Sequence, residues 1–443
     1  MLHIAALATV VALGQYNPNW GPSPCAGGLC VPKWTPTYNM SRSTIFMPCN
    51  YSGHYDPAVA AKFGIVDFDW SNQKNQWVND APMDCMEKLV EQAQLIKAIN
   101  PMTKIWVYRE SVAAQPWYTD VREKLMDPAT SHWFLHFDPS VKNYTVPKCD
   151  TSFNPPRCSD LYHDQVQTPH YPTGDGACSA PCDCGAGVPC GRYLWDTRNK
   201  DLVDWLVNEH LTGKNSVGRP DGLISGIFLD DSIHNTTGFA ENCALADCEH
   251  DMGLSAQDML DLQYGWADMM NRTQARVLEL GGFDWRMFRP GAGTCDGPPF
   301  KRNSGSCTSY FRENCQSNSS LQHSAMMYGL GQGCNLALDK AGDVLDIDFH
   351  LPAFLTLRGP FAWLGWAWVG CSGSRGPGEP IKNVVPPVLP GSKWDKSVLN
   401  TDYGTPLGIC SETAPGSQVF QREYSKATVK VDCAHLTGTI TMK

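Results

Sequence analysis

The stretch GLISGIFLDD at residues 222–231 carries the clearest strand pattern in the chain. Its aliphatic residues share one face, namely Leu223, Ile227 and Leu229. The opposite face holds Gly226, Phe228 and Asp230, because successive side chains of a strand point to opposite sides. An aliphatic face suits contact with covering helices. We therefore expect Asp230 to point inward at the carboxyl end of the strand and Asp231 to point away from it.

Strand patterns and helical patterns alternate on both sides of this stretch. The other strand candidates lie at 43–50, 64–70, 104–110, 193–196, 285–288 and 361–368. Helical periodicity appears at 83–100, 117–126, 202–211, 255–280 and 342–357. This alternation predicts a parallel sheet covered by helices, either closed as a barrel or open as a doubly wound sheet. Phosphate-binding glycine motifs are missing, which disfavours a nucleotide site. We therefore expect an α/β fold of the (β/α)8 TIM-like barrel type.

The remaining segments divide the chain around this barrel. Residues 1–15 resemble a signal peptide, and residues 16–370 are assigned to the barrel. Cysteine-rich insertions at 138–190 and 291–315 are expected to be long loops stapled by disulfides. A Gly/Pro-rich coil then leads into an alternating run at 418–431, which predicts a hairpin turning near 425–427. Residues 371–443 are thus expected to form a small C-terminal β appendage.

Composition narrows the classes of function. The chain has 443 residues, with 35 basic and 45 acidic side chains and a formal net charge of −10. It contains no basic block, so nucleic acid and anionic membranes are poor candidate partners. A hydrophobic content of 42% excludes a disordered chain.

The 19 cysteines favour an oxidising compartment. Six N-x-S/T sequons and the apolar run at 4–13 fit a secreted glycoprotein, and ten apolar residues are too few to span a bilayer. The alternative is a metal site in the run CSAPCDCGAGVPC, which lacks a histidine at finger spacing. We expect disulfides, with at least one cysteine left over because the count is odd.

Carboxylates at strand ends are the candidate catalytic residues, since barrel enzymes carry their chemistry there. In KIWVYRE at 104–110, alternation turns Trp106, Tyr108 and Glu110 inward. In GIVDFDW at 64–70 it turns Asp67 and Asp69 inward. The face of Asp196 in YLWD is ambiguous, and this residue is equally suited to capping a helix.

Two facing carboxylates are what hydrolysis of a glycosidic bond requires. We assign Asp230 as nucleophile or base and Glu110 as general acid, with Asp67 and Asp69 holding sugar hydroxyls or tuning the pair. The other substrate-side candidates are Trp70, Trp106, Tyr108, Asp196, Asp231 and His234. This hypothesis needs a carbohydrate partner and no cofactor or metal.

Two other classes of function stay open. A catalytically silent carbohydrate-binding or cell-surface glycoprotein could use the same aromatic groove. A metal-dependent hydrolase could use Asp230, Asp231 and His234. A serine hydrolase is disfavoured because no G-x-S-x-G elbow is present. The pairs Met269–Met270 and Met326–Met327 are interpreted as helix core.

Two motifs resemble a known group. The strand end GIFLDD and the segment at 402–431, DYGTPLGICSETAPGSQVFQREYSKATVKV, look like those of glycoside hydrolase-like barrel proteins. The resemblance implies that Asp230 carries the catalytic carboxylate, and that Arg422, Glu423 and Tyr424 belong to β structure after the barrel. FAWLGWAWVGC and the cysteine insertions resemble secreted, uncharacterised proteins of microbial eukaryotes. These insertions depart from the glycosidase-like pattern.

Overall fold

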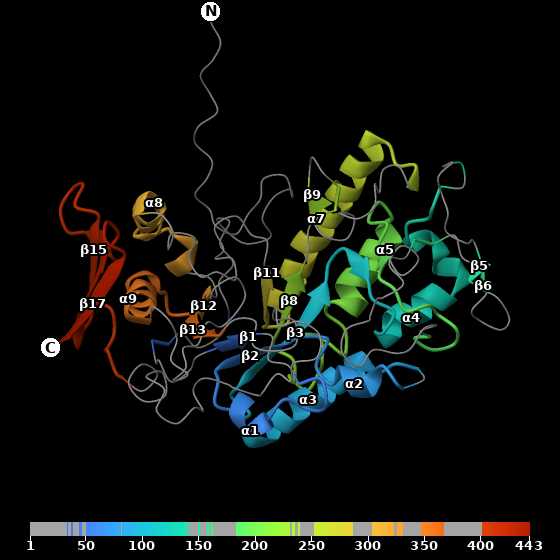
Figure 1. The fold of residues 1–443 in the computed structure, drawn as a ribbon, viewed down its shortest axis with the longest axis horizontal. Helices are drawn as coiled ribbons and strands as arrows, with labels where there is room; N and C mark the ends of the chain where they lie inside the picture. Colours follow the sequence, from blue (N-terminus) through green and yellow to red (C-terminus); the bar gives the residue numbers. More distant parts are fainter. Residues whose placement is uncertain are drawn as a thin grey trace, which may run out of the picture.

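A parallel sheet of seven strands forms the centre of the part of the chain that the structure describes (Figure 1). The structure is a computed structural model, and it describes residues 33, 37–38, 44–46, 50–80, 82–138, 140, 149–150, 157–158, 161–162, 183–230, 233–234, 238–239, 252–286, 304–322, 326–330, 347–366 and 401–443. The strands are β1 (Thr44–Phe46), β2 (Ile65–Phe68), β3 (Lys104–Glu110), β8 (Gly226–Asp230), β11 (Phe283–Arg286), β12 (Met326–Leu330) and β13 (Ala362–Trp366).

The order of these strands is β11-β8-β3-β2-β1-β13-β12, and every pair is parallel. The first strand, β1, therefore lies beside the last, β13. Starting from β1, the sheet follows chain order through β2, β3, β8 and β11, and on the other side it runs back through β13 to β12. The predicted α/β class with a parallel sheet is confirmed.

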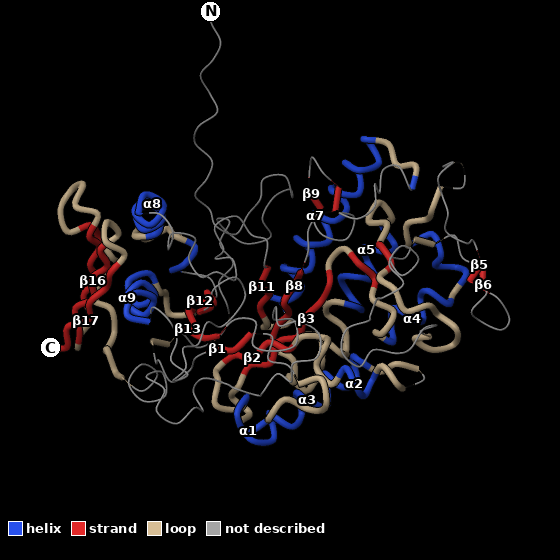
Figure 2. Tube along the Cα trace, in the orientation of Figure 1, coloured by secondary structure: helices blue, strands red, loops and turns tan. Residues whose placement is uncertain are grey.

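Helices flank this sheet (Figure 2). They are α1 (Pro57–Ala60), α2 (Lys74–Trp77), α3 (Cys85–Ile99), α4 (Thr119–Met126), α5 (Lys200–Trp205), α7 (Ala256–Glu279), α8 (Ser304–Asn314) and α9 (Ile347–Leu357). Shorter helical turns are the 3-10 turns η3 (Pro128–Trp133) and η7 (Ser320–Gln322) and the π turn η5 (Leu206–His210). Helix α7 begins with a capping box in which Ser255 and Asp258 bond each other's backbone N–H. Helix α3 ends at Ile99, and its C-cap Asn100 directly precedes Pro101.

Short antiparallel pairs lie outside the central sheet. They are β4 (Ala113–Ala114) with β7 (Tyr193–Leu194), β5 (Cys149–Asp150) with β6 (Arg157–Cys158), and β9 (Ile233–His234) with β10 (Gly238–Phe239). A four-stranded antiparallel sheet ends the chain, with β14 (Ser411–Glu412), β15 (Val419–Glu423), β16 (Ala427–Asp432) and β17 (Thr437–Met442). Strands β15 and β16 form the predicted hairpin.

One strand assignment and one helix assignment were wrong. The segment YLWD was expected in the parallel sheet, but its first two residues form β7, which pairs antiparallel with β4. Met326 and Met327 were interpreted as helix core, yet they begin β12. Methionine favours helices, and a five-residue run has too few positions to reveal its period, so tertiary pairing decided the outcome. Met269 and Met270 are buried in α7, as expected.

The predicted alternation of the strands is confirmed by the apolar clusters. The large apolar core under the helices contains the side chains on one face of β2, β3 and β8. They are Val66, Phe68, Ile105, Val107, Ile227 and Leu229. A smaller cluster on the opposite face contains Ile65, Trp106 and Phe283, together with Phe361 and Trp363. The sheet therefore has an apolar filling on its inner face below the strand ends.

Gly226 is required at its position because the Trp106 indole lies over it. A Cβ atom at Gly226 would stand 2.6 Å from the Trp106 ring and 2.4 Å from the Phe283 carbonyl oxygen. Trp106 is fully buried, and its ring centroid is 6.3 Å from that of Phe283. Because Gly226 of β8 has no side chain, the Trp106 indole of β3 can occupy the space beside it.

The C-terminal sheet is docked on α9 and α8. Arg422 is buried and donates to the carbonyls of Gly408 (2.9 Å) and Thr356 (3.3 Å), while the Tyr424 hydroxyl donates to that of Leu355 (2.5 Å). The last two carbonyls lie at the carboxyl end of α9, where a cation offsets the helix dipole. The Arg-Glu-Tyr motif therefore has a structural role.

Two disulfides reinforce this docking, and both join α8 or the residue after it to the C-terminal region. They are Cys307–Cys433 and Cys315–Cys410. The cysteines at 307 and 315 were expected to staple a loop, but they fasten a helix to a sheet instead. Cys85 and Cys184 are buried free thiols, and burial raises the pKa of each, which suits inert thiols. No helix within the described ranges is long and apolar enough to cross a membrane.

We expect Gly226→Ala to lower the free energy of unfolding by about 1–3 kcal/mol, because the added methyl group must displace the Trp106 ring or the strand. Urea unfolding checks this. Gly408→Ala is the matched control, since its Cβ would meet no atom within 4 Å. Equal loss in both variants would contradict the packing argument.

We expect Tyr424→Phe to cost about 1–3 kcal/mol, because the Leu355 carbonyl would stay buried without its donor. Thermal or urea unfolding under non-reducing conditions measures it. Tyr264→Phe is the control, because Tyr264 is 58% exposed on α7. An unchanged stability for Tyr424→Phe would show that the hydroxyl does not hold the sheet on α9.

Candidate active site at the strand ends

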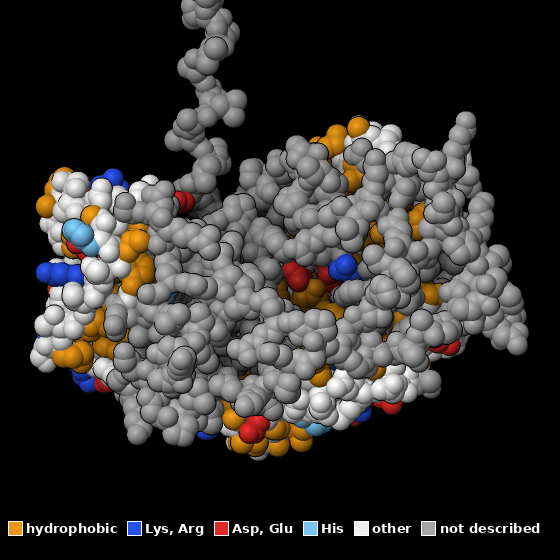
Figure 3. Space-filling model, viewed as in Figure 1, with side chains coloured by type: hydrophobic (Ala, Val, Ile, Leu, Met, Phe, Trp, Pro, Cys, Tyr) orange, Lys and Arg blue, Asp and Glu red, His pale blue; other side chains and the backbone are white. Residues whose placement is uncertain are grey.

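The carboxyl ends of β3 and β8 bring Glu110 and Asp230 together. The two residues are partners in the parallel ladder, and each is the last residue of its strand. Adjacent strands lie about 4.8 Å apart, so the two backbones are close and at the same end of the sheet. Glu110 is buried and Asp230 is half-buried. In the space-filling view, acidic and basic side chains appear beside apolar ones where Figure 1 draws β8 (Figure 3).

Glu110 is oriented by its own strand and the turn that follows. The Tyr108 hydroxyl donates to Glu110 Oε2 at 3.0 Å, and the Val112 N–H donates to Oε1 at 3.3 Å. Tyr108 meets Phe228 of β8 edge-on, with ring centroids 5.4 Å apart. Both carboxyl oxygens of Glu110 thus accept a hydrogen bond. The Tyr108 hydroxyl, which donates one of them, is held in place by the packing of its ring against Phe228.

Asp230 is positioned through its backbone by Ser111. The Asp230 carbonyl accepts from the Ser111 N–H at 3.0 Å and from its hydroxyl at 2.7 Å. The Trp266 indole N–H of α7 donates to the same hydroxyl at 3.0 Å. Ser111 therefore ties the ends of β3 and β8 to each other and to α7. The sequence offered no signal for this role, because a serine after a strand is common in loops.

Asp67 lies on the inner face of β2 and is completely buried. Neither of its carboxyl oxygens has a hydrogen-bond partner among the residues that the structure describes. Burial, followed by the nearby charges of Asp69 and Asp230, raises the pKa of Asp67 well above its ordinary value. A raised pKa extends to higher pH the range in which this carboxyl group keeps its proton.

Asp69 is engaged in the turn after β2. Its Oδ1 accepts from the Ser71 N–H at 2.6 Å and from the Ser71 hydroxyl at 2.5 Å. Burial raises the pKa of Asp69, while the Ser71 hydrogen bonds and the Lys74 charge oppose that shift. These contacts give Asp69 a role in shaping the loop beside the strand ends.

The predicted aromatic residues are well packed. Trp70 lies against Trp117, with ring centroids 4.8 Å apart, and Lys74 Nζ lies 5.2 Å from the Trp70 ring centroid. Trp70 is half-buried, whereas Trp106 and Tyr108 are buried. Of these rings, Trp70 has the largest accessible part.

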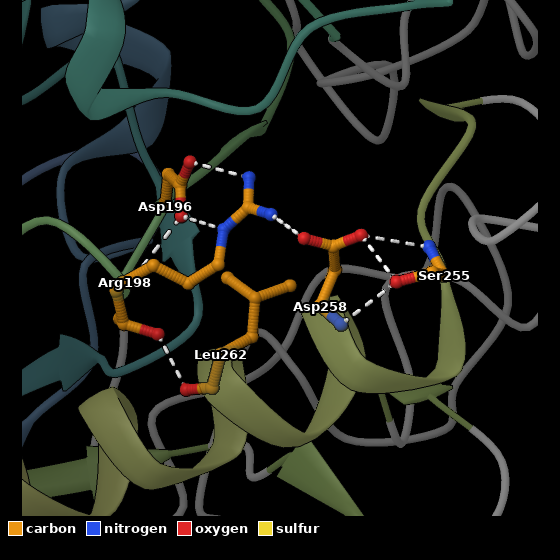
Figure 4. A network of polar contacts seen from close by, with 6 residues as sticks. Asp196, Arg198, Ser255, Asp258 and Leu262 are labelled. Atoms are coloured by element: carbon orange, nitrogen blue, oxygen red, sulfur yellow. Dashed lines mark hydrogen bonds and ion pairs between the residues drawn. The ribbon is translucent and has the colours of Figure 1, made fainter.

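Asp196 belongs to an ion-pair network that joins the loop before α5 to α7 (Figure 4). Arg198 donates to both carboxylate oxygens of Asp196 at 2.8 Å, and to Asp258 at 2.5 Å. The Thr197 hydroxyl donates to the Leu262 carbonyl at 2.6 Å. Asp196 does not cap α5, because Asn199 does. The network fastens this loop to the first turns of α7.

The remaining predicted residues carry no described side-chain geometry. Asp231 lies outside the described residues, and His234 falls in the short strand β9. Of the four cysteines considered for a metal, Cys178 and Cys182 also lie outside. Within the described part of the chain, no group of three or more His, Cys, Asp or Glu side chains could hold a metal ion.

Comparisons with known proteins give only distant likenesses. No family model matches the chain, and no curated protein matches it. Among solved structures it is similar to a cyclic alpha-maltosyl-(1→6)-maltose hydrolase from Arthrobacter globiformis in complex with maltose, at 11% identity and a TM-score of 0.32, covering 97% of this chain and 96% of that one.

Two further solved structures have the same level of likeness. Sucrose 6F-phosphate phosphorylase from Thermoanaerobacter thermosaccharolyticum has 10% identity and a TM-score of 0.37, covering 90% of this chain and 95% of that one. A debranching enzyme of Nostoc punctiforme has 10% identity and a TM-score of 0.38, covering 91% and 88%. The chain thus has a distant structural similarity to carbohydrate-active enzymes, at scores that identify neither its family nor its substrate.

Proposed function

We propose that this protein is a secreted glycoside hydrolase-like enzyme that cleaves a poly- or oligosaccharide with a pair of carboxyl groups. The observation that carries the proposal is the ladder pairing of Glu110 with Asp230 at the carboxyl ends of adjacent strands. Parallel α/β folds place their ligands at this edge of the sheet. The central strands belong to a (β/α)8 barrel in this proposal: the pairing of the first strand, β1, with the last, β13, supports it, while β11 and β12 form the two edges of the described sheet.

The two carboxyl groups divide the reaction between them. Glu110 is the general acid and protonates the leaving glycosidic oxygen, which suits the more buried member of the pair. Asp230 is ionised and acts as the nucleophile at the anomeric carbon or as the base that activates water. The Tyr108 hydroxyl keeps the Glu110 carboxyl group in place. Trp70 is the ring that stacks on a sugar face, because it keeps accessible surface.

The disulfides fit the compartment in which such an enzyme works. Cys307–Cys433 and Cys315–Cys410 persist in oxidising environments. Together with the six sequons and the apolar N-terminal run, they support secretion.

We expect Asp230→Asn and Glu110→Gln each to lower the rate of glycan hydrolysis by about 10²–10⁴-fold, because each isostere removes an acid or base from the reaction. A panel of poly- and oligosaccharides, assayed for released reducing ends, measures the rate. Asp268→Asn is the matched control, since its side chain is 60% exposed on α7. Unfolding curves establish that the variants fold.

The same panel separates this proposal from a carbohydrate-binding protein. Wild-type rates retained in both Asp230→Asn and Glu110→Gln would overturn the assigned pair. Binding of a glycan without cleavage by the wild type would identify a binding protein instead.

A further inference from the structure

Asp67 is the most unusual polar group on the inner face of the sheet. Its exposed fraction is 0%, and neither carboxyl oxygen is bonded by another described residue. Buried carboxyl groups almost always have hydrogen-bond donors, because burial of an unpaired charge costs several kcal/mol. An unpaired carboxyl group on the same sheet, close enough to Asp230 for that charge to affect its pKa, therefore needs an explanation.

The surroundings of Asp67 are apolar on one side and acidic on the other. Ile65, two residues earlier on the same face, packs with Trp106 and Phe283. In the ladder, Asp67 lies beside Trp106 of β3 and Phe46 of β1, neither of which ionises. The charged groups that act on it are Asp69, from the following turn, and Asp230, from β8.

The other titratable groups near this end of the sheet are already engaged. Glu110 and Tyr108, on the inner face of β3, are bonded to each other. Asp69 is bonded by Ser71, and the Lys74 charge lies close enough to act on Asp69. The neighbouring charges that dominate at Asp67 are therefore negative, which favours its uncharged form.

We propose that Asp67 is a positioning residue of the site. It is a carboxylic acid that keeps its proton, so that Asp230 is the carboxyl group that carries the negative charge in this part of the sheet. This inference rests on the proposed function for its chemical meaning. Because Asp67 is uncharged, Asp230 can ionise without a second charge behind it. If Asp67 ionised as well, two carboxylates would share one poorly solvated interior, and Asp230 would bind a proton more tightly.

The proposal fixes the sign of a pH effect on stability. Below the unfolded-state pKa of Asp, about 3.9, both the folded and the unfolded chain hold the proton. Above that value the unfolded chain releases it and the folded chain does not. Asp67 therefore destabilises the folded state increasingly as the pH rises toward its raised pKa, whereas an asparagine at this position would not.

The experiment compares the wild type with Asp67→Asn in urea unfolding between pH 4 and pH 9. We expect the ratio of their unfolding equilibrium constants to grow with pH by up to about tenfold per unit, in favour of the variant. Asp268→Asn, which replaces an exposed carboxylate, should show a nearly constant ratio. A constant ratio for Asp67→Asn would overturn the proposal.

A second measurement uses the wild type alone, so the proposal stays testable if the variant does not fold. Infrared spectra of protein with ¹³C-labelled aspartate carboxyl groups should contain a protonated carboxyl band at pH 7. Where Asp67→Asn folds, the band should be weaker than in the wild type, because the contribution of Asp67 is lost. Absence of the band from the wild type would overturn the proposal.

Activity is tested separately. With a glycan that the wild type hydrolyses, the acid limb of the pH–rate profile should stay in place in Asp67→Asn, because an amide and a protonated carboxyl group both leave Asp230 without a second charge nearby. An acid limb that moves to lower pH in the variant would show that Asp67 is charged in the wild type and would overturn the link to Asp230. If the wild type hydrolyses no glycan, the proposed function fails, while the unfolding and infrared measurements still decide the state of Asp67.

Discussion

The parallel pairing of β3 with β8 is the interaction on which the rest of the structure depends. Its register sets Trp106 beside Gly226, where the indole fills the space that a side chain would occupy. Four residues further, the same register sets Glu110 beside Asp230. A slip of one residue would turn every inner side chain toward the helices. The register in which a tryptophan packs over a glycine is therefore the register that makes Glu110 and Asp230 neighbours at the strand ends.

Apolar filling and acidic groups occupy successive levels of one sheet face. The cluster around Trp106 and Phe283 fills the lower level and excludes water, while Glu110 and Asp230 lie at the strand ends. Electrostatic effects are strongest where solvent is excluded. The rings below the acids thus serve two purposes, since they hold the sheet together and intensify the influence of one carboxyl group on another.

Alternation within long strands was readable from the sequence, and pairing between strands was not. The inward positions of Asp67, Glu110 and Asp230 follow from local pattern, which has a fixed period of two. Three or more turns of periodic residues likewise predicted α3 and α7. Met326 and the segment YLWD were misassigned because both runs are short, and their neighbours in the sheet come from distant parts of the chain. Ser111 could not be found from sequence, since its contacts with Asp230 and Trp266 span more than 100 positions.

The two disulfides make the C-terminal sheet resistant to loss by backbone cleavage. Cys315 and Cys410 are separated by 95 positions and Cys307 and Cys433 by 126, so each bond closes a long covalent ring. A protease that cuts the chain once between Cys315 and Cys410 leaves both fragments in one molecule. In an extracellular setting rich in proteases, a nicked chain would keep its strands in place until a reductant separated the fragments.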